Sequence, residues 1–134
     1  MTELQTLASA AKSVRKHAHA PYSGFLVGAA LLDEQGNVHL GTNVENAAFP
    51  LGSCAEGNAI GAMIASGGKR IVCIVVVGGR DQLESCTPCG GCRQRIAEFA
   101  DASTDIVMTE ESGEFTHFTL AELLPAAFVW PESS

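Results

Sequence analysis

Three cysteines and one glutamate are the residues of this chain best suited to chemistry. Glu56 follows Cys54 by two residues, and Cys89 and Cys92 come later in the chain, directly after a proline. Zinc has four ligands in most protein sites, so a centre with three protein thiolates keeps one position for water. A bound zinc ion lowers the pKa of that water toward neutrality. The pattern therefore predicts a zinc centre with Cys54, Cys89 and Cys92 as metal ligands and Glu56 as the catalytic base.

Both groups of these residues lie where the sequence predicts the start of a helix. The N-terminus of a helix carries partial positive charge, which stabilises a thiolate over a thiol. Cys89 and Cys92 are three residues apart, so one helical turn allows both to face the same ion. Cys54 must then come from the start of another helix, and the metal would hold the two helices side by side. From the same turn, Glu56 can accept a proton from the water and pass it on.

A fourth cysteine near the motif leaves an alternative open. Cys86, Cys89 and Cys92 have the spacing of part of an iron–sulfur ligand set. With Cys54 they could form a closed site of four thiolates, which would be structural and not catalytic. Glu56 would have no task in such a site. The chain would then be a non-catalytic metal-binding module.

The elements that must position these residues follow from the hydrophobic pattern, which alternates between helix and strand. Helices are predicted over about 4–14, 54–67 and 89–100, with a final helical turn at 120–124, and Ile60, Met63 and Ile64 are expected to face inward. Strands are predicted at 25–32, 37–40, 71–77 and 105–108. This order predicts an α/β fold with a mixed sheet and helices on both faces, in a single domain covering 1–134.

Composition excludes several classes of function. The chain has 134 residues, 46% of them apolar and 17% charged, and a net charge of −7. An acidic chain with scattered basic residues is a poor match for a nucleic-acid polymer. No apolar run is long enough to cross a bilayer, and no secretory signal is visible at the start, so we expect a cytoplasmic protein that acts on a small molecule.

The remaining cysteine and histidine residues are expected to be structural. Five cysteines without an export signal favour a metal site or catalysis over disulfide bonds. None of the histidines, His17, His19, His39 and His117, has ligand spacing to the cysteine motif. We expect all four at the surface or at helix ends.

Several further motifs, in order along the chain, carry a resemblance to a known family. They are Pro21-Tyr22-Ser23-Gly24-Phe25, the segment Gly41-Thr42-Asn43-Val44-Glu45-Asn46-Ala47-Ala48-Phe49, Pro88-Cys89-Gly90-Gly91-Cys92-Arg93-Gln94, and Leu123-Leu124-Pro125-Ala126-Ala127-Phe128. Together with the cysteine motif, they resemble the cytidine deaminases of the small, homotetrameric, three-cysteine type. The resemblance spans about 21–128, which is most of the chain.

The resemblance implies a fold, a reaction and a set of substrate contacts. The implied fold is a three-layer α/β/α sandwich with a mixed five-stranded sheet. The implied reaction is the zinc-dependent hydrolytic deamination of cytidine and 2′-deoxycytidine to uridine and 2′-deoxyuridine, with one zinc ion per subunit and ammonia as the second product. A related expectation is a deaminase for another small aminopyrimidine nucleoside, such as a nucleoside antibiotic.

The substrate contacts implied by the resemblance come from several segments. Asn43 and Glu45 would bind the ribose hydroxyls, Phe25 would pack against the pyrimidine, and the Ala55 backbone would contact the polar edge of the base. The remaining implied contacts lie between subunits of a homotetramer: Phe128 would reach a neighbouring subunit's site, and Tyr22 and Phe49 would line shared walls.

One position departs from the family pattern. Tetrameric members usually have an arginine directly after the catalytic glutamate, where it hydrogen-bonds to the zinc thiolates, and this chain has Gly57 there. Three thiolates around a divalent ion leave a net charge of −1, which weakens the metal as a Lewis acid unless the charge is offset. The two helix N-termini are expected to supply part of the compensation, with Arg93 as a possible substitute.

Overall fold

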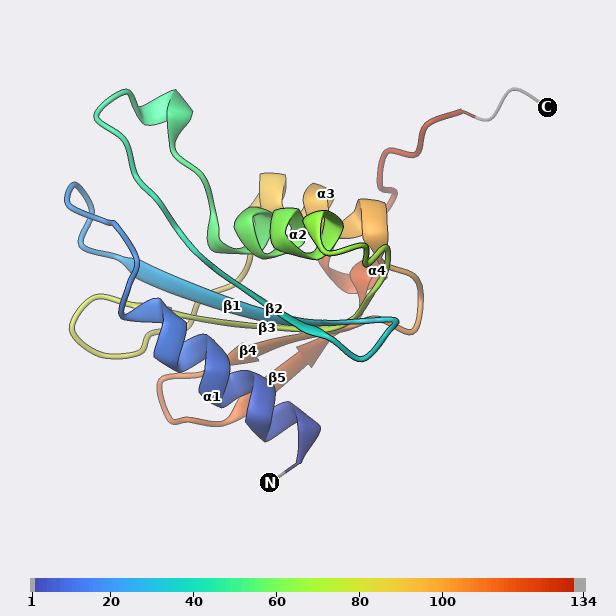
Figure 1. Cartoon of the computed structure of the whole chain (residues 1–134), viewed down its shortest axis with the longest axis horizontal. Coiled ribbons are helices and arrows are strands. Elements are labelled where there is room, and N and C mark those ends of the chain that lie inside the picture. The colour runs from blue at the N-terminus through green and yellow to red at the C-terminus, as the bar shows by residue number, and fades with distance from the viewer. Residues whose placement is uncertain (1, 132–134) are drawn as a thin grey trace.

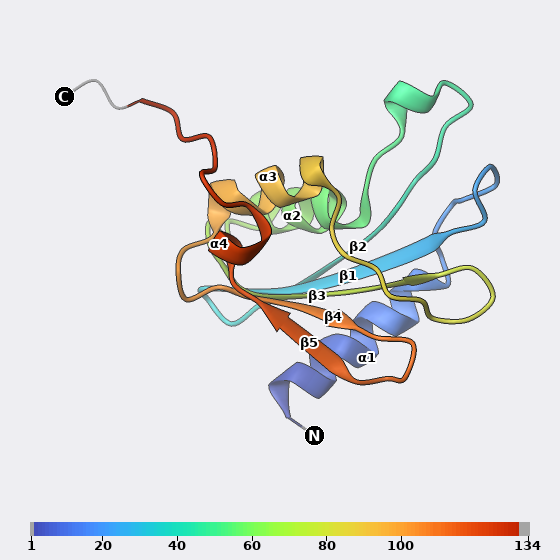
Figure 2. The ribbon, with the colours of Figure 1, turned by 180° about the vertical axis from the view of Figure 1, so that it is seen from behind.

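The computed structural model describes residues 2–131 and contains one five-stranded mixed sheet between two layers of helices. The strands have the order β2-β1-β3-β4-β5, with β3 and β4 parallel and the other pairs antiparallel. Helix α1 covers one face, and α2, α3 and α4 cover the other (Figures 1 and 2). In chain order the elements are α1 (Glu3–Arg15), β1 (Leu26–Asp33), β2 (Val38–Thr42), the short 3-10 helix η1 (Phe49–Leu51), α2 (Ala55–Ala65), β3 (Ile71–Gly79), α3 (Gly90–Phe99), β4 (Asp105–Thr109), β5 (Phe115–Phe118) and α4 (Leu120–Leu123).

This architecture confirms the three-layer α/β/α expectation. The central strand β3 is buried along almost its whole length, as its continuous apolar run predicted. Burial of apolar surface on both faces of the sheet is the main force that holds the layers together. No helix among residues 2–131 is both long and apolar enough to cross a membrane.

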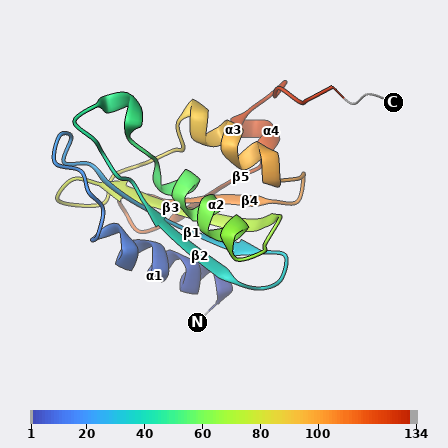
Figure 3. The ribbon, with the colours of Figure 1, turned by 45° about the horizontal axis from the view of Figure 1, so that its top comes forward.

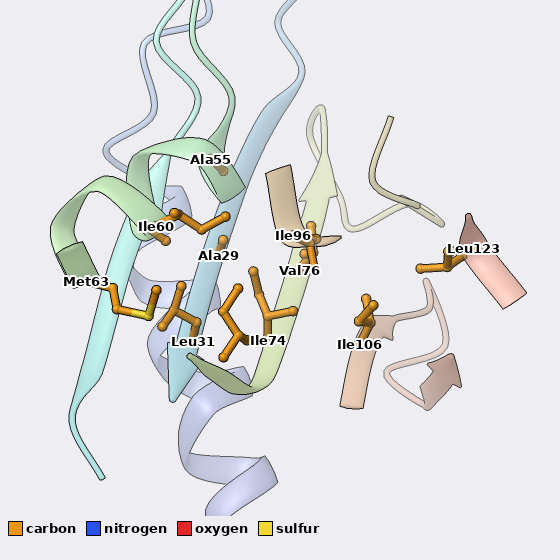
Figure 4. Close-up of a cluster of buried hydrophobic side chains, with 12 residues drawn as sticks. Ala29, Leu31, Ala55, Ile60, Met63, Ile74, Val76, Ile96, Ile106 and Leu123 are labelled. Atoms are coloured by element: carbon orange, nitrogen blue, oxygen red, sulfur yellow. The ribbon is translucent and has the colours of Figure 1, made fainter. Parts of the chain in front are cut away.

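Two separate apolar clusters fill the space on either side of the sheet. One lies under α2 and α3 and includes Leu31, Met63, Ile74 and Ile96, all fully buried (Figure 4). The other lies under α1 and contains Leu7, together with small residues of that helix and alternate residues of β1 and β3. The helix starts that carry the cysteine motif therefore rest on a well-packed face of the sheet.

Glycine at one position of the sheet allows α2 to approach β2 closely. A side chain on Gly41 would overlap the carbonyl oxygen of Ala55 and the backbone nitrogen of Ala59. Both atoms belong to backbone and cannot move aside. Gly41 therefore sets the distance between the sheet and the first turn of α2, which is the turn that carries Glu56.

The structure corrects three expectations. Strand β5 lies at 115–118, where the pattern predicted no strand; it is a short edge strand paired only with β4. Ile64 was expected to face inward, but its side chain is exposed. His39 was expected at the surface, but it is buried, and its Nε2 lies 2.8 Å from Oδ2 of the equally buried Asp33.

Two segments extend away from the layered core. The chain between β2 and α2, which includes η1, forms a long arm beside the 20–25 loop (Figure 1). Bridges between Val44 and both His19 and Ser53 hold the base of this arm together. The C-terminal segment after α4 leaves the helical layer at the opposite end of the molecule (Figures 1 and 2). Both segments carry exposed aromatic side chains.

Candidate metal centre and active site

The two cysteine groups of the motif lie at the starts of two adjacent helices, as the sequence predicted. Cys54 is the N-cap of α2, and its Sγ accepts a hydrogen bond from the Gly57 N–H at 3.3 Å. Cys89 is the N-cap of α3, directly after the buried Pro88. The two helices are in contact on one face of the sheet (Figure 3). Their positive ends therefore favour negative charge on the cysteine sulfurs.

Three of the motif side chains converge closely enough to hold one metal ion. The sulfurs of Cys54 and Cys92 and a carboxylate oxygen of Glu56 all lie within 4.8 Å of one another, and this is the only such group among residues 2–131. Cys92 and Glu56 are buried, with 1% and 4% of their surfaces exposed. The donor set of thiols and a carboxylate suits zinc.

Cys89 lies next to this group and outside its tightest part. Its side chain is exposed, and it lies three residues before Cys92, at the N-cap of α3. It also lines the same cavity as Cys54, Glu56 and Cys92. All three cysteines predicted as ligands therefore face one cavity, and Cys54 and Cys92 are the pair that the fold brings closest to the carboxylate.

Close packing shifts the pKa values of the central groups in different directions. A hydrogen bond with Cys92, assisted by the Gly57 N–H and by Arg95, lowers the pKa of Cys54 to about 6. The same hydrogen bond, together with burial, raises the pKa of Cys92. Burial, together with the charge of Cys54, raises the pKa of Glu56 to about 7. A carboxyl group with such a pKa can both accept and donate a proton near neutral pH.

The cavity beside Cys54, Glu56 and Cys92 has a volume of about 160 Å³ and is lined by both ionisable and apolar groups. Its lining includes Val27, Asn43, Ala55 and Thr87, in addition to the cysteines and Glu56. Ala55 is fully buried and lies between Cys54 and Glu56 on the first turn of α2. The cavity thus combines apolar groups with the thiols and the carboxylate.

Cys86 lines this cavity but does not join the close ligand group. Burial, with a smaller contribution from the charge of Glu56, raises the pKa of its thiol to about 11. The side chain lies against Gly78 of β3. This placement disfavours the closed four-thiolate alternative, which needs Cys86 as a thiolate beside the other three.

Asn43 and Glu45 both hold the loop that leads into β1. Asn43 accepts a hydrogen bond from the Val27 N–H at 2.9 Å and donates one to the Phe25 carbonyl oxygen at 2.8 Å. Glu45 accepts hydrogen bonds from the backbone N–H groups of Tyr22 and Ser23 at 3.0 and 3.1 Å. Of the two, only Asn43 lines the thiol cavity. Glu45 lines a neighbouring hollow of about 360 Å³ between the arm and the 20–25 loop.

Phe25 lies at the edge of the thiol cavity without lining it. Its ring and the Cys86 side chain both contact Gly78, and the Arg80 guanidinium carbon lies 5.4 Å from the ring centroid. The half-buried ring therefore stands next to a residue of the cavity wall. Glycine at position 78 is what lets the ring and the thiol approach the strand together.

The aromatic residues predicted at shared walls are not gathered around the thiols in the single chain. Tyr22 and Phe49 stack edge to face, with ring centroids 5.6 Å apart, at the exposed end of the arm. Phe128 is 67% exposed and lines a separate surface hollow with Trp130 and residues of α3. One chain thus brings together the thiols, Glu56 and Asn43, and leaves these aromatic residues at its periphery.

Arg93 was expected as the substitute for the missing arginine near the thiols, but a different basic residue lies beside them. The Arg93 guanidinium donates hydrogen bonds to the carbonyl oxygens of Pro88 and Leu123, both at 2.8 Å. Arg95 instead reaches a cysteine of the motif, with Nη1 3.8 Å from Cys54 Sγ. The sequence could have indicated Arg95, because it follows Cys92 by three residues and so lies on the same side of α3.

The chain is similar in sequence to known proteins over most of its length. Residues 1–109 match the family model described as the cytidine and deoxycytidylate deaminase zinc-binding region. The chain is 39% identical over 126 residues to a cytidine deaminase of Sporosarcina psychrophila, an alignment covering 94% of this chain and 91% of the relative. A cytidine deaminase of Halalkalibacterium halodurans is 41% identical over 124 residues, with 92% of each chain covered.

A solved structure extends the similarity to the fold. The crystal structure of cytidine deaminase from Burkholderia pseudomallei superposes with a TM-score of 0.86 at 40% identity, covering 96% of this chain and 100% of that chain. A cytidine deaminase structure from Mycobacterium leprae has a TM-score of 0.78 at 38% identity, covering 93% and 99% of the two chains.

Proposed function

The chain belongs to the cytidine and deoxycytidylate deaminase family, and on this premise we propose that it converts cytidine and 2′-deoxycytidine to uridine and 2′-deoxyuridine, with zinc as cofactor and ammonia as second product. The observation that carries this proposal is the buried Glu56 carboxylate beside the sulfurs of Cys54 and Cys92, facing a small cavity. The single domain covering 1–134 contains every group that the reaction needs from one chain.

Cys54, Cys89 and Cys92 would hold the zinc ion. Two helix N-termini and the hydrogen bond from Gly57 favour the thiolate forms that zinc needs. When bound, zinc supplies a water molecule that loses its proton near neutral pH. Binding of the cation would also lower the pKa of Glu56, because the positive charge offsets part of the rise that burial and, to a smaller extent, the charge of Cys54 cause.

Glu56 would carry the protons of the reaction. Its carboxylate accepts a proton from the attacking water, whose oxygen forms a bond to C4 of the pyrimidine. The carboxyl group then donates this proton to N3 of the ring. It would next accept the second proton from the new C4 hydroxyl and donate it to the departing amine, so that the C4 carbonyl forms and ammonia leaves as the C4–N4 bond breaks. Burial of Glu56 keeps bulk water away from these transfers.

The substrate would lie between the thiol cavity and the arm. Asn43 borders both the cavity and the Phe25 backbone, so its amide is positioned to bind a ribose hydroxyl next to the base. Glu45 would bind the second hydroxyl from the neighbouring hollow. Phe25 would pack on the pyrimidine, and the Ala55 backbone would contact its polar edge.

The assembly would be a homotetramer with sites shared between subunits. Exposed aromatic residues support this proposal: Tyr22, Phe49 and Phe128 are 52%, 73% and 67% exposed, although large aromatic rings gain stability from burial. In the tetramer, Phe128 would complete a neighbour's site, and Tyr22 and Phe49 would line its walls. We place the enzyme in the cytoplasm, where its nucleoside substrates would be salvaged.

The test is an ultraviolet assay with purified protein and its Glu56→Gln variant. Cytidine and 2′-deoxycytidine should both be consumed by the wild-type protein, whereas the variant should lose at least about a thousandfold in kcat while retaining zinc. Equal rates for the two proteins would overturn the role of Glu56. If cytidine is not consumed but another aminopyrimidine nucleoside is, the substrate assignment is wrong while the chemistry of the site stands.

A further inference from the structure

A basic residue that the resemblance does not assign lies against the candidate metal centre. Arg95 extends from α3, one turn after Cys92, and its Nη1 lies 3.8 Å from Cys54 Sγ on the neighbouring helix. Of the hydrogen bonds among residues 2–131, this is the one that a charged side chain donates to sulfur. The guanidinium therefore bridges the starts of the two helices that carry the predicted ligands.

Glycine residues on both helices leave the space that Arg95 occupies. A side chain at Gly57 would begin 3.2 Å from Cδ of Arg95 and 3.1 Å from Cys54 Sγ. A side chain at Gly91 would begin 3.2 Å from Nη1 of Arg95. All three distances are shorter than ordinary van der Waals contacts, so larger residues at positions 57 and 91 would displace the guanidinium. Its route to the sulfur thus depends on two glycines.

The proposed centre needs a positive charge at this point. Three thiolates leave a zinc site with a net charge of −1, and Glu56 adds a buried carboxylate next to it. Arg93 is already engaged with the carbonyl oxygens of Pro88 and Leu123, and Arg15 with those of Leu26, Gly79 and Arg80. Neither of these guanidinium groups has a hydrogen bond to a cysteine sulfur.

We propose that Arg95 is a positioning residue of the metal centre: it hydrogen-bonds to the Cys54 thiolate and offsets part of the negative charge of the three thiolates. This inference rests on the zinc ligands of the proposed function. Lower charge at the sulfurs makes zinc a stronger Lewis acid, so water loses its proton at lower pH. Arg95 is exposed, so its interaction with the thiolate contributes little to the stability of the fold. Its expected effect is on the properties of the metal centre.

The experiment compares a variant that removes the charge with one that keeps it. Arg95→Gln and Arg95→Lys are compared with Arg70→Gln, which removes an equal charge from an exposed ion pair with Asp101. Zinc affinity is measured by competition with a chromophoric chelator. We expect Arg95→Gln to bind zinc about tenfold more weakly, Arg95→Lys to recover part of the loss, and Arg70→Gln to match the wild type.

Further readouts separate tuning of the centre from a structural role. Cobalt-loaded Arg95→Gln should show shifted thiolate-to-metal absorption bands, with unchanged urea unfolding of the metal-free protein. Its kcat should fall with little change in KM, and the acid limb of the pH profile should move to higher pH. Wild-type zinc affinity together with an unchanged cobalt spectrum in Arg95→Gln would overturn the proposal. Zinc affinity is independent of substrate, so a chain inactive on cytidine would refute the proposed function and leave this inference standing.

Discussion

The helix starts above the sheet and the two projecting segments are built in opposite ways. At the helix starts, Glu56 and Cys92 are almost fully buried, and the Gly57 N–H donates a hydrogen bond to Cys54 Sγ. In the arm and the C-terminal segment, Phe49, Leu51, Phe128 and Trp130 each expose more than two thirds of their surface. The first region is complete within one chain, whereas the second presents apolar surface that one chain does not cover.

This difference separates the groups that bind metal and transfer protons from the groups that enclose the substrate. Groups that bind metal and move protons need fixed geometry, and packing against the sheet supplies it. Groups that enclose a substrate need only be brought to the cavity, and a second copy of the chain can do that. Changes in the first region should therefore abolish chemistry or folding, and changes in the second should weaken activity and leave the fold intact.

The largest expected effect is loss of the metal centre. Cys92→Ala removes a buried sulfur of the central group and should abolish zinc binding and activity, since two thiols remain of the predicted three. Zinc content by mass spectrometry of metals and the cytidine assay check this. Cys73→Ala is the matched control: it removes a buried cysteine under α1, on the other face of the sheet, and should retain zinc and activity. Full zinc content in Cys92→Ala would contradict the ligand assignment.

The next effect tests the support beneath the centre. Gly41→Ala should destabilise the protein by about 3 kcal/mol or more, because the added methyl group overlaps backbone atoms of Ala55 and Ala59. Urea unfolding measures the change. Gly61→Ala is the control, since a side chain there meets nothing within 4 Å and alanine favours a helix. Equal stability of both variants would show that the contact between β2 and α2 does not set the position of Glu56.

Burial of Glu56 should make the metal-free protein less stable as the pH rises. Its pKa is raised from 4.5 to about 7, so between these pH values the folded state keeps a proton that the unfolded state releases. Raising the pH through this window therefore favours unfolding, by roughly 3 kcal/mol in total. Glu56→Gln should lack this contribution. The check is the difference between the two urea-unfolding curves at pH 5 and pH 8, which should be largest at pH 8.

The smallest effect is expected in the arm. Phe49→Ala removes a mostly exposed ring, so the free energy of unfolding should change by less than about 0.5 kcal/mol. If a neighbouring subunit's site uses this ring, kcat/KM should still fall about tenfold, which corresponds to about 1.4 kcal/mol of binding. Val38→Ala, at an exposed position of the edge strand β2, should leave activity unchanged. An unaltered kcat/KM in Phe49→Ala would show that the Phe49 ring of the arm does not contribute to the site.

Much of the core could be predicted because local patterns are strong there. Strand β3 has a continuous apolar run, and the cysteine motif marks the starts of α2 and α3 through capping and Pro88. Strand β5 was missed because it is four residues long, lies at the sheet edge and contains no fully buried residue. His39 was misplaced because its burial depends on pairing with Asp33, a contact across the hairpin that composition does not reveal.

The amino-acid sequence alone was enough to predict the thiols and the glutamate, their positions at helix starts, and the family that their spacing resembles. These features are local, because a helix N-terminus acts on residues within its own first turn. The identity of the basic residue beside the Cys54 sulfur became clear from the tertiary structure and not from the sequence. Arg95 and Cys54 are 41 residues apart, and their contact exists because the sheet places α2 and α3 side by side with glycines between them. Such contacts arise from packing, which the spacing of residues along the chain does not encode.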